Sequence, residues 1–168
     1  MTPLLWLSLG AWGAALAVGA VDGLYFHLWK LRLYARPQSR TEHFTHTARA
    51  WLLGPLLWVA FVDPRLDLLV ALAAVDTAVV FADVWLENES RRDIGGIARA
   101  EYLVHVAANT LHTGAMTLAM VVWWVSPSAQ VPTVLRLLAE GLVACTVPVA
   151  LLHALLIFWN PPARLRHG

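Results

Sequence analysis

The chain has 168 residues, of which 59% are hydrophobic, and its formal net charge is only +1. A soluble domain of this length needs only about half of its residues to be apolar. Here the surplus lies in long uninterrupted runs, which are typical of membrane proteins. The single cysteine, Cys145, excludes a disulfide framework and a cysteine-rich zinc site. Nucleic acid is not an expected partner, because the basic residues lie between apolar runs and not along one soluble face.

Five segments approach the roughly 20 apolar residues that a helix needs to cross a bilayer. In chain order they are 4–29, 43–62, 66–87, 102–125 and 133–159. Short turn-like breaks at 63–64 and 126–132 separate the second segment from the third and the fourth from the fifth. We therefore expect an all-α integral membrane protein with five transmembrane helices in a single domain.

Positive charge is distributed unequally between the two ends of these helices. The loops at 30–40 and 91–99 and the C-terminal tail carry nine arginine and lysine residues, whereas the opposite ends carry only Arg65 and Arg136. The positive-inside rule then predicts a multi-pass protein of the inner (plasma) membrane, with its N-terminus outside and its C-terminus in the cytosol. We interpret the loop arginines as solvated residues that set this orientation, with binding of anionic lipid head groups as the alternative.

Tryptophan side chains at both ends of the helices agree with this orientation. The outer set is Trp6, Trp58, Trp123 and Trp124, and the inner set is Trp29, Trp85 and Trp159. Such sets are typical of the aromatic belts at membrane interfaces.

The pattern Arg-x-Glu-x-x-x-His-x-Ala occurs at 40–48 and again at 99–107, each time where a helix leaves the cytosolic side. The preceding helices match more loosely, and either Asp76 or Asp83 is the counterpart of Asp22. We predict two copies of a helical hairpin, at about 4–62 and 66–125, related by a pseudo-two-fold axis along the membrane normal. These four helices would form a four-helix bundle, and the helix at 133–159 would pack outside it.

The repeat predicts a metal site near the cytosolic face. Glu42 and His46, like Glu101 and His105, are four residues apart and therefore share one face of a helix. On the third helix, acidic side chains form a matching stripe. The candidate ligands are Asp22, His27, Glu42, His46, Asp83, Glu87, Glu101, His105 and His112.

Carboxylates within the hydrocarbon explain why a metal is expected. Each charged side chain there costs about 3 kcal/mol, and facing carboxylates repel unless cations or protons neutralise them. Imidazole and carboxylate together suit iron, zinc or manganese. The arrangement resembles the architecture of di-iron carboxylate four-helix bundles. It implies two metal ions per chain, with iron slightly favoured over zinc.

Two interpretations without a metal remain open for these residues. The glutamates stand at helix starts, where the helix dipole favours them, and each histidine would then be a simple hydrogen-bond partner. Alternatively, Arg49, which shares a face with Glu42 and His46, would neutralise a carboxylate.

Three functions follow from the sequence. The first is a metal-dependent oxidoreductase or hydrolase that acts, among membrane lipids, on a lipid-like or quinone-like substrate. The second is an electron-transfer protein with haem b held by His46 and His105, although the nearby carboxylates do not suit a porphyrin. The third is a transporter of protons or metal ions, although the outer half lacks a comparable polar stripe. Neither a catalytic residue nor the oligomeric state follows from the sequence.

Overall fold

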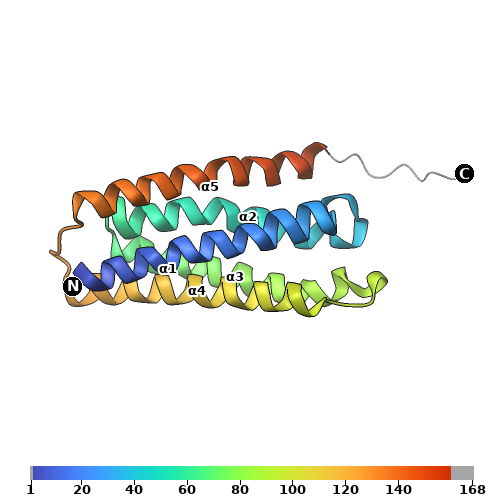
Figure 1. Cartoon of the computed structure of the whole chain (residues 1–168), viewed down its shortest axis with the longest axis horizontal. Helices are drawn as coiled ribbons and strands as arrows, with labels where there is room; N and C mark the ends of the chain where they lie inside the picture. The colour runs from blue at the N-terminus through green and yellow to red at the C-terminus, as the bar shows by residue number, and fades with distance from the viewer. Residues whose placement is uncertain (1, 160–168) are drawn as a thin grey trace, which may run out of the picture.

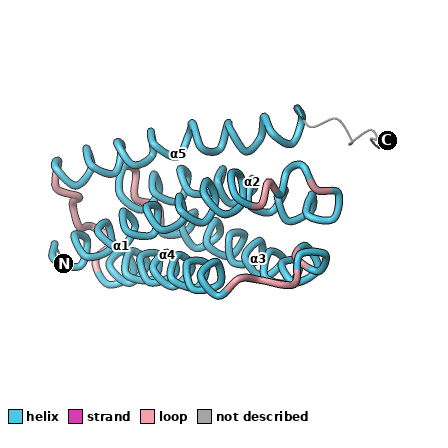
Figure 2. The backbone as a smooth tube through the Cα atoms, turned by 45° about the vertical axis from the view of Figure 1, so that its right-hand side comes forward, coloured by secondary structure: helices cyan, strands magenta, loops and turns pink. Residues whose placement is uncertain are grey.

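A computed structural model describes residues 2–159 of the chain and leaves the side chain of Trp159 undescribed. Within this range the fold is all-helical, with five long helices in up-and-down order and no strand (Figures 1 and 2). The all-α prediction is therefore confirmed. The tail arginines at 164 and 166 lie outside the described residues.

The helices lie where the apolar runs predict them. They are α1 (Thr2–Ala20) with its π-helical continuation η1 (Val21–Lys30), α2 (Arg40–Leu57) with its π-helical continuation η4 (Trp58–Val62), α3 (Leu66–Ser90), α4 (Arg99–Val125) and α5 (Thr133–Trp159). The connecting loops contain the short 3-10 turns η2 (Leu33–Ala35), η3 (Pro37–Ser39) and η5 (Arg92–Ile94). Within residues 2–159, no helix extends beyond its predicted span by more than three residues at either end.

Three segments of the described chain are long and apolar enough to cross a membrane, namely Thr2–Lys30, Leu66–Ser90 and Thr133–Phe158. Large apolar side chains on their outer faces are exposed, including Phe81 and Trp85 of α3. Because a soluble protein rarely exposes so much contiguous apolar surface, these features indicate a helical membrane protein. The two helices that carry the repeated motif, α2 and α4, are not among the three.

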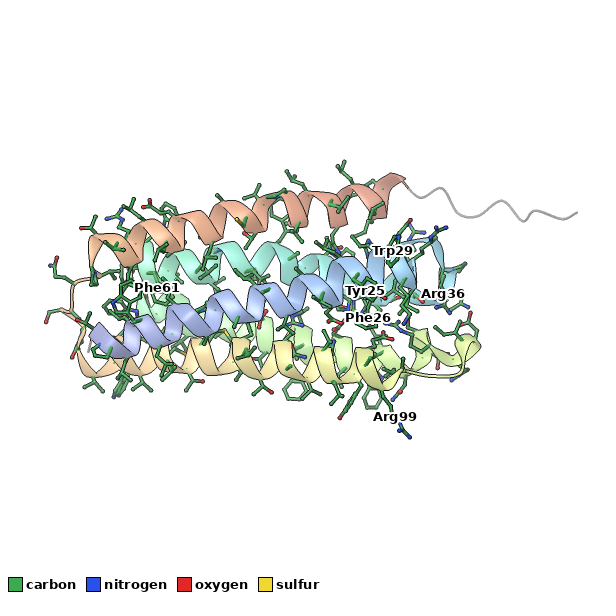
Figure 3. All side chains as sticks on the ribbon, in the orientation of Figure 1. Tyr25, Phe26, Trp29, Arg36, Phe61 and Arg99 are labelled. Carbon is green, nitrogen blue, oxygen red and sulfur yellow. The ribbon has the colours of Figure 1, made fainter. Side chains whose placement is uncertain are left out.

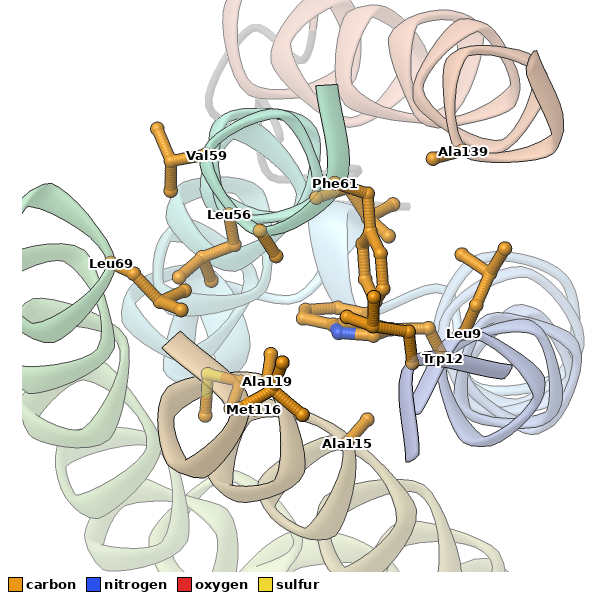
Figure 4. Packing of buried hydrophobic residues seen from close by; sticks show 14 of the residues in the cluster. Leu9, Trp12, Leu56, Val59, Phe61, Leu69, Ala115, Met116, Ala119 and Ala139 are labelled. Atoms are coloured by element: carbon orange, nitrogen blue, oxygen red, sulfur yellow. The ribbon is translucent and has the colours of Figure 1, made fainter. Parts of the chain in front are cut away.

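The most extensive helix contacts are those of α1 with α4 and of α2 with both α3 and α5. In Figure 1, α5 lies along the edge of the bundle above α2. The apolar core fills the end of the bundle near the turns at 63–65 and 126–132. Figure 4 shows its members, among them Leu9, Trp12, Leu56, Phe61, Leu69, Met116 and Ala119. The opposite end is therefore left for polar side chains.

Trp123 is not an interface residue, and the prediction that it belongs to an aromatic belt is wrong. Its side chain is buried, and its indole Nε1 donates a hydrogen bond to the carbonyl oxygen of Ala60 at 2.9 Å. A buried indole needs such a partner, and here the bond joins α4 to η4. The adjacent Trp124 is exposed.

The π-helical segment η1 determines which side chains at the end of the first helix lie on the same side of the helix. Asp22 and His27 are five residues apart, so in an α-helix they would lie about 140° apart around the axis. In a π-helix, hydrogen bonds join residues five apart, and such residues lie on nearly the same side. Both side chains are buried in the bundle. The change of helix type therefore brings Asp22 and His27 to one site.

Candidate metal centre

Eight acidic and histidine side chains are buried together at the end of the bundle next to the loops 31–39 and 91–98. Each of the first four helices contributes two, and we call the group the polar cluster: Asp22 and His27, Glu42 and His46, Asp83 and Glu87, Glu101 and His105. None is more than 8% exposed. In Figure 3 the labels of Tyr25 and Phe26, which lie between Asp22 and His27 in the sequence, mark this end of the molecule.

The two histidines of the repeated motif contact aspartates crosswise, which means that each aspartate lies in the other predicted hairpin. His105 Nδ1 of α4 lies 3.1 Å from Asp22 Oδ2 of η1, and His46 Nε2 of α2 lies 3.3 Å from Asp83 Oδ1 of α3. The second oxygen of Asp83 lies 3.8 Å from His105 Nε2. Thr45 Oγ1 also donates a hydrogen bond to Asp83 Oδ1 at 2.5 Å. Asp83 therefore lies between the two histidines at the centre of the cluster.

His27 completes the group from the side of η1. Its ring centroid lies 4.0 Å from that of His46, and its Nε2 lies 3.5 Å from Asp22 Oδ1 and 3.8 Å from Glu101 Oε1. One ligand atom each of His27, Glu42 and His46 lies within 4.8 Å of the other two. These three residues form a possible histidine–glutamate metal site.

Eight polar atoms of the cluster are buried without a hydrogen-bond partner among the described residues. They are Asp22 Oδ1, both ring nitrogens of His27, Glu42 Oε1, His46 Nε2, Asp83 Oδ2, Glu87 Oε1 and His105 Nε2. Buried polar atoms in native proteins are normally paired, so eight such atoms in one place call for a further partner. All eight are carboxylate oxygens or imidazole nitrogens, which are metal-ligand atoms.

Arg91 is part of this site, and the interpretation of it as a solvated loop residue is wrong. Its side chain is fully buried just beyond the end of α3, with Nη1 donating to Glu42 Oε2 at 2.5 Å and Nε donating to Glu101 Oε1 at 2.9 Å. Burial alone lowers the pKa of Arg91, but the bonds to Glu42 and Glu101 raise it above its ordinary value. The guanidinium therefore stays charged and joins the two glutamates of the repeat.

A signal for Arg91 is present in the sequence. Arg91 follows Glu87 by four residues, and so it continues the stripe of Asp76, Asp83 and Glu87 along one face of α3. Its position in an arginine-rich loop obscured this spacing.

The polar cluster carries an excess of negative charge. It contains five carboxylates, and Arg91 is the one guanidinium that contacts them among the described residues. With neutral imidazoles, four negative charges are left uncompensated in a buried site. Such an excess is strongly unfavourable unless further cations or protons are bound.

Arg49 does not contact the carboxylates of the polar cluster. Its Nε lies 3.9 Å from Asp76 Oδ1, and its Nη2 donates to Asn109 Oδ1 at 2.8 Å. His112 Nε2 lies 2.9 Å from Asp76 Oδ2. Of the nine predicted metal ligands, the structure thus brings eight together and places His112 in a second polar group with Asp76 and Arg49.

Comparisons with protein-family models, with curated proteins and with solved structures found no match for this chain. Its function is therefore inferred from its own geometry.

Proposed function

We propose that this protein is a membrane-embedded metalloenzyme whose polar cluster binds two divalent metal ions. The observation that carries this proposal is the set of eight unpaired ligand atoms, which come from four helices and lie in one buried site. Two divalent cations would also balance the four uncompensated negative charges. A single ion would leave two of them.

Distances within the cluster support shared metal ions. The separations between imidazole nitrogens and carboxylate oxygens include 3.3, 3.5, 3.7 and 3.8 Å, and most of these are long for a hydrogen bond. Two ligands bound at about 2.1 Å to one ion lie about 3.0–3.4 Å apart, depending on the coordination geometry. Small movements would therefore bring these atoms to one ion.

The remaining contacts hold the ligands in place. Asp22 Oδ2 lies beside His105 Nδ1, the ring nitrogen opposite the unpaired Nε2, and a carboxylate in that position orients a metal-binding imidazole. Arg91 binds Glu101, and Asp76 binds His112. Glu101 and His112 have no buried unpaired atom among the described residues, so they are not among the ligands that we propose.

Iron is slightly favoured over zinc because the site is rich in carboxylates and drawn from four helices. An iron site would supply oxidation of a lipid-like or quinone-like substrate, and a zinc site would supply hydrolysis at the level of the head groups. The haem alternative has less support: Asp83 contacts both His46 and His105, so a carboxylate lies where a porphyrin needs an apolar slot.

We further propose that all five helices cross the membrane and that the first four form a pseudo-two-fold repeat. A two-fold axis makes the packing of α1 on α4 equivalent to that of α3 on α2, and both pairs are among the most extensive contacts. The crosswise contacts of His105 with Asp22 and of His46 with Asp83 favour Asp83 over Asp76 as the counterpart of Asp22. The arginine-rich loops beside the site favour the cytosolic side for it.

Elemental analysis of gently purified protein tests the metal proposal. We expect about two iron or zinc ions per chain and an absorption spectrum without a Soret band. A Soret band would instead support the haem alternative. Protein that stays free of metal, both as purified and after incubation with ferrous iron or zinc, would refute the metalloenzyme.

A further inference from the structure

A cavity of about 270 Å³ adjoins the polar cluster and is lined by side chains of the first, second, fourth and fifth helices. Asp22 and His46 of the cluster form part of its wall. Each of these residues carries one of the unpaired ligand atoms described above. Most of the other lining residues are small or aliphatic, among them Ala15, Leu16, Gly19, Leu53, Ala108 and Val149. The cavity is thus an apolar space with the candidate metal centre at its polar wall.

Arg49 adds a further polar group to the cavity wall, to which His112 and His153 also belong. It follows His46 by three residues on α2, which is about 4.5 Å along the helix axis. Its Nε is buried without a hydrogen-bond partner among the described residues, and the carboxylate of Asp76 offsets its charge from 3.9 Å. A donor of this kind suits a neutral oxygen atom. An anionic group is disfavoured, because Asp22 lies in the same wall.

The size of the cavity limits what it can hold. Ligand sites usually have about 300–1,000 Å³, so a space of about 270 Å³ accommodates a ring or head group but not a whole lipid. Both α1 and α5 line the cavity, yet they make few contacts with each other. The rest of a long ligand would therefore pass between these two helices into the surrounding lipid.

We propose that this cavity is the substrate site and that it takes a lipid-soluble molecule with a neutral carbonyl or hydroxyl oxygen, such as a quinone ring. This inference rests on the proposed function, since the metal centre would act on the part of the ligand that lies beside Asp22 and His46. Arg49 binds the oxygen, and the aliphatic wall contacts the carbon skeleton.

Gly19 offers a variant that fills the cavity from a position outside the cluster. A Cβ atom added at Gly19 would meet no other atom within 4 Å, and Gly19 lines the cavity. Gly13 is the matched control, because it lies in the same helix with equally open space but does not line the cavity. Neither Gly19→Leu nor Gly13→Leu should alter the metal content.

Isothermal titration with decyl-ubiquinone in detergent micelles tests the proposal, with metal counted in the same samples. We expect saturable binding by the wild type, binding weaker by about tenfold or more in Gly19→Leu, and unchanged binding in Gly13→Leu. Decanoate, which is anionic, should bind much more weakly to the wild type. Equal binding of decyl-ubiquinone by all three proteins, no binding by the wild type, or preference for decanoate would overturn the inference.

The metal count separates failure of this inference from failure of the proposed function. Metal-loaded protein in which Gly19→Leu changes nothing refutes the cavity alone. Metal-free protein whose quinone binding is still lost in Gly19→Leu refutes the metalloenzyme and leaves the binding site standing.

Discussion

His105 Nδ1 lies 3.1 Å from Asp22 Oδ2, although the two residues are 83 positions apart in the chain. The corresponding histidine of the first motif copy, His46, lies 3.3 Å from Asp83. Each histidine is therefore held by an aspartate from the other hairpin. The shortest contact between each motif histidine and an aspartate therefore joins the two predicted hairpins.

Replacing either aspartate should have the same effect on metal binding. Asp22→Asn and Asp83→Asn each remove a proposed ligand charge and a contact that orients a histidine, so we expect each to weaken metal binding by about tenfold or more. Asp76→Asn is the control, because Asp76 contacts Arg49 and His112 and not the cluster. Competition with a metal-binding dye measures the affinities. A loss in Asp76→Asn as large as that in Asp83→Asn would contradict the assignment of Asp83 as the counterpart of Asp22.

Removing a motif histidine should remove metal but not the fold. We expect His46→Ala and His105→Ala each to bind well below the wild-type amount of metal while remaining in the membrane. Bound metal should stabilise the wild type, since a ligand that binds only the folded state raises its stability. A chelator should therefore lower the thermal midpoint of the wild type and have little effect on either variant.

His153→Ala is the control for this experiment, because His153 is a buried histidine whose backbone oxygen lies near His43, outside the cluster. Its metal content should match that of the wild type. Wild-type metal counts in both His46→Ala and His105→Ala would exclude these residues as ligands.

Arg91 should be essential for stability. Arg91→Gln leaves Glu42 and Glu101 without their shared cation, and breaking a buried ion pair from one side typically costs about 3–5 kcal/mol. Adding Glu101→Gln to this variant should restore part of the loss. Chemical unfolding in detergent, followed by tryptophan fluorescence, measures both.

The neighbouring Arg92 provides a matched control. It pairs with Glu89 at the surface, where both side chains are largely exposed, so Arg92→Gln should change the unfolding free energy by less than about 0.5 kcal/mol. If Arg91→Gln proves as mild as Arg92→Gln, Arg91 does not hold the two glutamates together.

Some features of the fold and of the site can be predicted from the sequence, and others cannot. The helix boundaries follow from the apolar runs, and the grouping of Glu42, His46, Glu101 and His105 follows from their four-residue spacing. Trp123 could not be placed, because its neighbour Trp124 has the same chemistry and only the helix rotation decides which indole is buried. Regular α-helical geometry also separates Asp22 from His27, and only the π-helical turn brings both to the site.

The orientation can be tested with single cysteines in a Cys145→Ser background. Arg92 and Ser128 are exposed at opposite ends of the bundle. In intact cells, a membrane-impermeant maleimide should label Ser128→Cys, whereas Arg92→Cys should react only after permeabilisation. The reverse pattern would invert the topology, and labelling of both in intact cells would contradict an odd number of crossings between them.

The contrast between the three apolar segments and the two motif helices bears on biogenesis. Helices α2 and α4 carry four of the eight cluster side chains, namely Glu42, His46, Glu101 and His105, and each charge costs about 3 kcal/mol on entry into the bilayer. On the proposed topology each is flanked in the chain by two strongly apolar segments, since α2 lies between α1 and α3, and α4 between α3 and α5. The translocon would therefore release α2 and α4 into lipid together with such a neighbour. The eight side chains of the cluster can meet only after α4 has entered, so binding of the proposed metal ions would be a late step in maturation.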